Sequence, residues 1–149
     1  MMYLRISGVL CVLLGVFLFG MWLTWPEFPY NRSGFPINRR FVAVSLNGQP
    51  FNHERLPQLP SLEVRRSALL QLRAFGSGGC NSWYSDIELS AARSIAWGKR
   101  ATTAAGCRAF ETETKFLRAL HNAARWRTEE GFLILENDTD VLRFLLAPR

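Results

Sequence analysis

Two cysteines are the residues of this chain best suited to chemistry, because a thiol can form a disulfide, bind a metal or attack a substrate. Cys80 and Cys107 lie in the polar half of the chain, whereas the third cysteine, Cys11, lies in a long apolar stretch. In an oxidising compartment the pair can form one disulfide, worth about 3 kcal/mol in the chain-entropy description of loop closure. In the cytosol both would stay as thiols. The residues alone leave both states open.

The surroundings of these thiols do not indicate a metal site or a catalytic site. Cys80 and Cys107 have neither CxxC spacing nor nearby histidines, so they cannot complete a tetrahedral metal site. A cysteine nucleophile needs a histidine base, and nothing places His53 or His121 near either thiol. His53 precedes a glutamate but lacks the second histidine of a metalloprotease helix. We therefore predict that the protein is not an enzyme and has no catalytic residue, metal or cofactor.

The glycine-rich stretch Gly76–Gly79 could cradle a phosphate if a lysine and serine ended it, or if a helix followed it. The sequence contains neither feature at this point. Glycine tolerates backbone conformations that are closed to other residues. We interpret the stretch as a turn between strands.

The N-terminal stretch Ile6–Trp25 contains no charged residue over 20 positions. A helix of this length spans roughly 30 Å, the thickness of the hydrocarbon core of a bilayer. We expect a transmembrane helix over residues 6–25, after a tail of residues 1–5 and before a proline-containing linker over residues 26–40. A cleaved signal peptide is the alternative, but Thr24 and Trp25 make a poor cleavage site.

The orientation of this anchor rests on two arguments that disagree. Arg32, Arg39 and Arg40 follow the apolar stretch, and the Lys/Arg count would keep the C-terminal domain inside. The short N-terminal tail and the cysteine pair favour the outside. We expect a single-pass inner-membrane protein with its C-terminal domain in the periplasm.

The chain has a net charge of +6, and arginines outnumber lysines sixteen to two. A basic protein can bind anionic lipid or nucleic acid. The arginines are scattered without a block of like charge, which is typical of an ordinary solvated surface. We expect the bilayer and an unidentified envelope protein as partners, and no nucleic acid.

Strand and turn patterns fill the middle of the chain. Phe41–Leu46 is rich in β-formers and ends at Asn47-Gly48, a dipeptide suited to a tight turn. Alternation over Leu70–Phe75 predicts a strand that ends at Gly76. Further short strands are expected at residues 83–89 and at residues 94–97, the latter closed by Gly98.

One amphipathic helix and a hairpin are predicted for the C-terminal third. Apolar residues recur at three- and four-residue spacing from Ala109 to Trp126, which predicts a helix packed over the sheet, with His121 at its boundary. Phe132–Glu136 and Val141–Leu146 are strongly apolar and flank a polar turn. This pattern favours two central strands.

Several of these segments resemble META domains, the HslJ-like family. Gly79-Cys80-Asn81 followed by Tyr84 resembles the GCN…Y motif of that family. The run Thr103 to Cys107 resembles its T-x-M-A-C motif. Within the predicted helix, the stretch from Glu113 through Phe116-Leu117 to Leu120 resembles its E-x-x-F-L-x-x-L motif. The departures are Phe41 in place of tryptophan, Ala105 in place of methionine and no glycine between Asn81 and Tyr84.

This resemblance implies an α+β domain over residues 41–149, a curved antiparallel sheet or partial barrel with one packed helix. It implies no catalytic residues, and it ties the chain to the bacterial envelope and its stress responses. We therefore expect a membrane-anchored envelope protein with a non-catalytic binding or structural role. The alternatives are a thiol-redox protein or enzyme that uses Cys80 or Cys107, and arginine-mediated binding of anionic lipid or nucleic acid.

Overall fold

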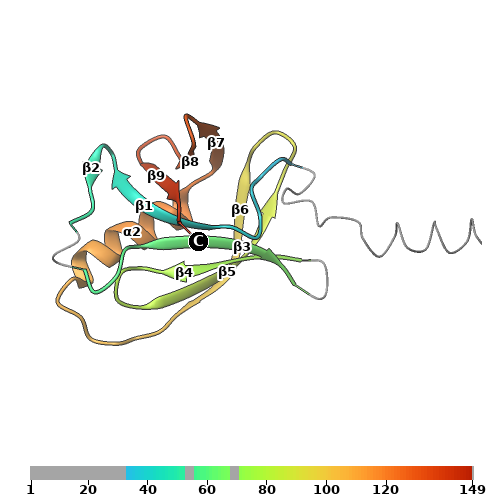
Figure 1. Cartoon of the computed structure of the whole chain (residues 1–149). Helices are drawn as coiled ribbons and strands as arrows, with labels where there is room; N and C mark the ends of the chain where they lie inside the picture. The colour runs from blue at the N-terminus through green and yellow to red at the C-terminus, as the bar shows by residue number, and fades with distance from the viewer. Residues whose placement is uncertain (1–32, 53–55, 68–70, 149) are drawn as a thin grey trace, which may run out of the picture.

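The computed structural model describes residues 33–52, 56–67 and 71–148, which form one curled antiparallel sheet and one helix (Figure 1). The strands are β1 (Arg40–Leu46), β2 (Gln49–Pro50), β3 (Ser61–Arg66), β4 (Leu72–Ser77), β5 (Ser82–Leu89), β6 (Ile95–Thr102), β7 (Arg125–Glu129), β8 (Phe132–Glu136) and β9 (Val141–Leu146). The helix, α2, runs from Phe110 to Asn122.

The strands follow the order β6-β5-β4-β3-β1-β9-β8-β7, and β2 pairs with β1. The first and last strands of this order approach each other at one end of the sheet. Ser94 and Arg125 form a bridge, and the amide of Ile95 donates to the carbonyl of Ala124 at 2.9 Å. The sheet is therefore a strongly curled half-barrel, in which the strands at its two edges, β6 and β7, come into contact at one end.

The core lies on the concave face of the sheet, where α2 covers it. Along β5 buried and accessible residues alternate, as expected for a strand with one face inward. Phe116 of α2 is fully buried, and its ring lies 5.9 Å from that of Phe51 and 6.2 Å from that of Phe144. These contacts confirm the predicted α+β fold of a curved sheet with one packed helix.

The predicted turn after the first strand is confirmed, and its asparagine also contacts the start of β9. Asn47 and Gly48 both adopt positive φ, at 52° and 77°. The side-chain oxygen of Asn47 accepts from the amide of Val141 at 2.7 Å, and its amide group donates to Asp140 at 3.0 Å. One asparagine thus fixes its own turn and ties it to the start of β9.

The C-terminal hairpin is confirmed with its predicted bounds, but the predicted end of the helix is wrong. Ala123 is already extended, at φ −61° and ψ 125°, and β7 then begins at Arg125. Trp126 was expected as the last helical residue, yet it is a strand residue, 4% exposed, opposite Leu135. Pairing of β7 with β8 therefore replaces the last helical turn and gives Trp126 a buried position in the sheet.

Two strand predictions in the middle of the chain also need correction. The sequence predicts one strand before Gly76, over Leu70–Phe75, whereas the structure has two, β3 and β4, which pair through Val64 and Ala74. Strands β4 and β6 continue through Gly76 and Gly98 and do not end there. Cross-strand pairing therefore overrides the low strand propensity of these glycines.

The predicted transmembrane helix at residues 6–25 lies outside the described residues, as does most of the linker at residues 26–40. Among the described residues no helix has the length and apolar character needed to cross a bilayer. The described end of the linker contributes to the core, since Phe35 is 1% and Ile37 4% exposed. The packed domain therefore includes residues that precede Phe41.

Replacing Asn47 should weaken the contact between the β1–β2 turn and β9 and so destabilise the domain. Asn47→Ala removes both side-chain hydrogen bonds and leaves a residue with a β-carbon at positive φ, so we expect a loss of about 2 kcal/mol in unfolding free energy. Asn47→Gly is the matched control, because it loses the same hydrogen bonds but tolerates the backbone. Urea unfolding should rank the wild type first, the glycine variant second and the alanine variant last.

Candidate functional site

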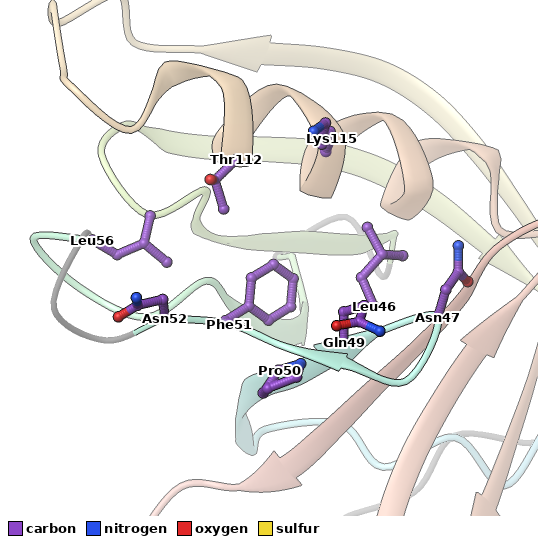
Figure 2. Close-up of a pocket in the computed structure, with 9 residues that line it drawn as sticks. All are labelled: Leu46, Asn47, Gln49, Pro50, Phe51, Asn52, Leu56, Thr112 and Lys115. Carbon is purple, nitrogen blue, oxygen red and sulfur yellow. The ribbon is translucent and has the colours of Figure 1, made fainter.

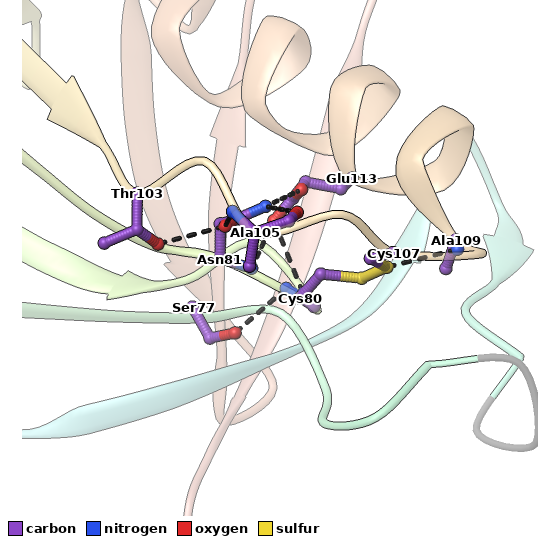
Figure 3. Close-up of a disulfide and its surroundings, with 9 residues drawn as sticks. Ser77, Cys80, Asn81, Thr103, Ala105, Cys107, Ala109 and Glu113 are labelled. Carbon is purple, nitrogen blue, oxygen red and sulfur yellow. Dashed lines mark hydrogen bonds between the residues drawn. A yellow bond between two sulfur atoms is a disulfide. The ribbon is translucent and has the colours of Figure 1, made fainter.

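Cys80 and Cys107 form a disulfide that joins the turn between β4 and β5 to the loop before α2 (Figure 3). Their Cα atoms lie 6.1 Å apart, within the usual range for a disulfide. Both residues are partly buried against the core. The disulfide therefore holds together two loops that are distant in the sequence.

Beside the disulfide lies a buried carboxylate, Glu113, which is only 3% exposed. One of its oxygens accepts from the backbone amide of Asn81 at 2.7 Å and from that of Cys80 at 3.4 Å. Its other oxygen accepts from the side-chain amide of Asn81 at 2.7 Å. A buried carboxylate needs such partners to offset the cost of leaving water. The first turns of α2 are thereby fixed to the β4–β5 turn.

Asn81 is the hub of this cluster, since each polar atom of its side chain has a partner (Figure 3). Its side-chain oxygen accepts from the amide of Ala105 at 2.7 Å and from the hydroxyl of Thr103 at 3.0 Å. Its side-chain nitrogen donates to Glu113 and, at 3.3 Å, to the carbonyl of Ala105. Asn81 therefore joins α2, the loop before it and the β4–β5 turn.

The glycines of the turn leave space for these contacts. A β-carbon on Gly78 would lie 2.6 Å from the carboxylate oxygen of Glu113. Gly79 has φ +116°, and a β-carbon there would lie 2.7 Å from a methyl carbon of Leu56. Gly78 and Gly79 form the predicted turn between two strands, whereas Gly76 still belongs to β4. The close approach of Glu113 and Leu56 requires glycine at both turn positions.

The structure brings together six of the seven motif residues that the sequence singled out. Gly79, Cys80, Asn81, Thr103, Cys107 and Glu113 surround the disulfide. Tyr84 is separate, because it lies on β5 with its ring 40% exposed and the guanidinium of Arg73 5.2 Å from the ring centroid. Sequence reasoning missed Ser77, whose hydroxyl accepts from the amide of Gly79 at 2.9 Å. A lone serine beside glycines gives no signal of this kind.

The cluster is suited to fixing the loops and not to reacting with a substrate. The side chain of Asn81 uses its donors and acceptors on Glu113, Thr103 and Ala105, and Glu113 uses both oxygens on the turn. A general base must be free to reach a substrate proton. Within the described residues no group of three or more potential metal ligands is found. His53 lies outside the described residues.

His121 lies at the far end of α2 from Glu113, between two tryptophans. Its ring is 5.8 Å from that of Trp83 and 5.5 Å from that of Trp97, nearly perpendicular to both. Burial lowers the pKa of His121 to about 4, and the positive charge of Arg100 adds to this effect. A hydrogen bond to the backbone of Leu117 acts in the opposite direction. This boundary residue is therefore neutral at physiological pH.

A second candidate region is the groove between α2 and the segment that follows β1, with a volume of about 410 Å³ (Figure 2). The ring of Phe51 lies at its centre, between Leu46 and Leu56, and Thr112 and Lys115 face it from the helix. The ammonium of Lys115 is paired with Glu111 at 2.7 Å. The groove thus has an apolar floor and a polar rim, without a free charge on Lys115 to select a ligand.

Removing the charge of Glu113 should weaken the cluster. Glu113→Gln places an amide nitrogen opposite the donor groups of Asn81, so we expect a loss of about 1–3 kcal/mol in unfolding free energy. Glu111→Gln is the matched control, since Glu111 lies two positions earlier in the same helical turn and is exposed. Denaturant unfolding should show a large shift for the first variant alone, and equal shifts would contradict the role of Glu113.

The pKa of His121 predicts how stability depends on pH. The folded value of about 4 lies below the ordinary value of 6.5, so protons bind preferentially to the unfolded chain. The contribution of His121 is fully present above about pH 6.5 and declines as the pH falls towards 4. We expect His121→Phe to flatten this part of the curve. Melting temperatures of both proteins between pH 4 and 7.5 give the comparison, and parallel curves would contradict the assignment.

Comparisons with known proteins agree with this architecture. A family model described as META domain matches residues 36–149. A solved structure described only as an NMR structure of a protein is 22% identical, with a TM-score of 0.54 over 72% of this chain and 88% of its own, which shows the fold alone. No curated protein matches the chain. Because the family match extends over most of its length, the chain belongs to the META domain family.

Proposed function

We propose that this chain is a membrane-anchored envelope protein whose META domain acts by binding or structural support and not by catalysis. The observation that carries the proposal is the disulfide between Cys80 and Cys107. Structural disulfides persist in oxidising compartments and are rare in the cytosol. The bond therefore supports a domain on the periplasmic side of the inner membrane.

The anchor in this proposal is the uncharged stretch Ile6–Trp25, as inferred from sequence. The folded domain is described from Ser33, so the intervening chain is short. Such a connection would hold the domain close to the bilayer. The lipid bilayer is accordingly its first proposed partner, and an unidentified envelope protein is the second.

The non-catalytic part of the proposal rests on the hydrogen bonds of the motif cluster. Asn81 and Glu113 are buried polar side chains near the disulfide, and both are engaged with other parts of the same chain. The family motif then specifies a fold, and function belongs to the surfaces that the fold displays. The family resemblance supports a role in envelope stress as part of this proposal.

Nucleic acid is not a proposed partner, because several arginines are already paired with carboxylates. Arg73 lies 2.9 Å from Asp86, and Arg127 lies 2.8 Å from Glu136. Binding to a polyanion needs guanidinium groups that can reach phosphates. Paired arginines supply less of this attraction than the net charge of +6 suggests.

A thiol-redox role is the second candidate, and one contact favours it. The sulfur of Cys107 accepts from the backbone amide of Ala109 at 3.1 Å, directly before α2. After reduction, the same amide and the start of the helix would stabilise a Cys107 thiolate. A cysteine in this position would be the more reactive of the two.

Thiol labelling in intact cells separates the two roles and tests the location. In a Cys11→Ser background we expect a membrane-impermeant maleimide to label the chain only after reduction, because both remaining sulfurs are in the disulfide. An alkaline phosphatase fusion after Arg149 should be active. Rapid labelling without reductant would contradict the structural disulfide and favour the redox role. An inactive phosphatase fusion would contradict the periplasmic location.

A further inference from the structure

The outer face of the sheet carries two aromatic side chains on neighbouring strands. Phe75 of β4 and Tyr84 of β5 are directly opposite each other, and Tyr84 is opposite Ala101 of β6. All three side chains lie on the face away from the core, because their neighbours Ala74 and Trp83 are buried. Tyr84 is 40% exposed. This row of side chains crosses three strands.

Arginines hold the two rings from one side. The guanidinium of Arg65 lies 4.9 Å from the centre of the Phe75 ring, and that of Arg73 lies 5.2 Å from the centre of the Tyr84 ring. Arg65 and Arg73 are cross-strand neighbours in the adjoining row of the same face. Such cation–π contacts restrict the rings before any ligand arrives. Elsewhere the two rings border a depression that Ser82 and Thr103 also line.

On that side the surface is hollowed. A depression of about 370 Å³ has Phe75, Tyr84 and Ala101 as apolar walls and the hydroxyl residues Ser82 and Thr103 at its edge. This volume falls in the range of roughly 300–1,000 Å³ typical of small-ligand sites. Aromatic walls with a few hydroxyls at the edge suit a ligand that has apolar faces and polar edges.

A second depression, of about 230 Å³, adjoins the first and shares Phe75 and Ser82 with it. Its lining is polar, with Arg40, Gln58 and Glu63 as its largest hydrogen-bonding side chains. The two depressions together form a groove that crosses the strands, apolar over β5–β6 and polar over β1–β3. An apolar part beside a polar part suits a linear ligand with more than one ring.

Two of the three arginines along the groove, Arg65 and Arg73, have carboxylate partners, and Arg40 of the lining is the third. Arg65 is paired with Glu63, and Arg73 is paired with Asp86 at 2.9 Å. Their guanidinium groups are thus neutralised within the same face and also packed on the rings. A polyanion would have to break these pairs, whereas hydroxyl groups can share their donors and acceptors.

We propose that this groove binds a β-1,4-linked oligosaccharide of glucose-like configuration. Sugars of this class keep their ring substituents equatorial, so each ring presents a flat C–H face for Tyr84 and a rim of hydroxyls for Ser82, Gln58 and Glu63. Their chains are extended ribbons, which matches a groove that runs across strands. This binding goes beyond the proposed envelope role and does not depend on the location of the domain.

Titration calorimetry on the full-length chain in mild detergent tests this assignment, with cellohexaose and N-acetylchitohexaose as probes. We expect at least one of them to bind the wild type. Tyr84→Ala should weaken that binding about tenfold, the order of effect that loss of an aromatic stacking platform gives. Tyr84→Phe should keep most of the affinity, because the ring face remains.

Phe110→Ala is the matched control, since Phe110 is an exposed aromatic residue elsewhere, at the start of α2. It should leave the affinity unchanged, and circular dichroism should show that each variant is folded. Three results would overturn the proposal: no binding of either sugar at millimolar concentration, equal affinities for the wild type and Tyr84→Ala, or binding of polyuridylate in place of the sugars.

Discussion

The hydrogen bonds between Glu113 and the turn at Cys80-Asn81 are the constraint on which this domain depends. A carboxylate that is 3% exposed is costly unless several donors face it. Here the backbone amides of the turn and the side chain of Asn81 supply them. The same contacts fix where α2 begins on the sheet, and Phe116 one turn later then reaches Phe51 and Phe144. The position of the helix over the core thus follows from a polar cluster at its start.

The disulfide and the polar cluster both order the long loop before α2, by different mechanisms. The disulfide restrains Cys107 in the unfolded chain as well as in the folded one, so it acts largely by reducing the entropy of unfolding. Asn81 acts in the folded state only, through its hydrogen bonds to Thr103 and Ala105. Residues 103–106 are exposed and have few apolar contacts of their own. Without both restraints this loop would have little to hold it.

The elements that the sequence predicts well are those whose pattern is local. The turn at Asn47-Gly48 and the hairpin around residues 137–140 carry their own turn chemistry, and both are found where they were expected. The helix end was misplaced because Ala123, Ala124 and Trp126 continue the helical spacing. Only the partner strand β8, which follows later in the chain, makes an extended conformation there more favourable.

At the candidate site, too, the sequence indicates local features but not the contacts between residues that are distant in the chain. Glu113 could be recognised as unusual, since it is a charged residue on the apolar stripe of its helix. That its partner is Asn81, about thirty residues earlier, follows only from the fold. The groove on the outer face could not be predicted either, because Phe75, Tyr84 and Ala101 become neighbours through strand register. An exposed aromatic residue in one strand does not indicate a binding site until its cross-strand neighbours are known.

Native-state hydrogen exchange at the backbone amide of Asn81 tests most directly whether Glu113 holds the domain together. This amide donates to a buried carboxylate at 2.7 Å in a turn. Turn amides ordinarily exchange quickly through local opening, whereas core amides exchange only on global unfolding. If the account is right, Asn81 should exchange as slowly as the core residue Leu133 of β8. Exchange as fast as that of Gly48, in the exposed β1–β2 turn, would contradict it.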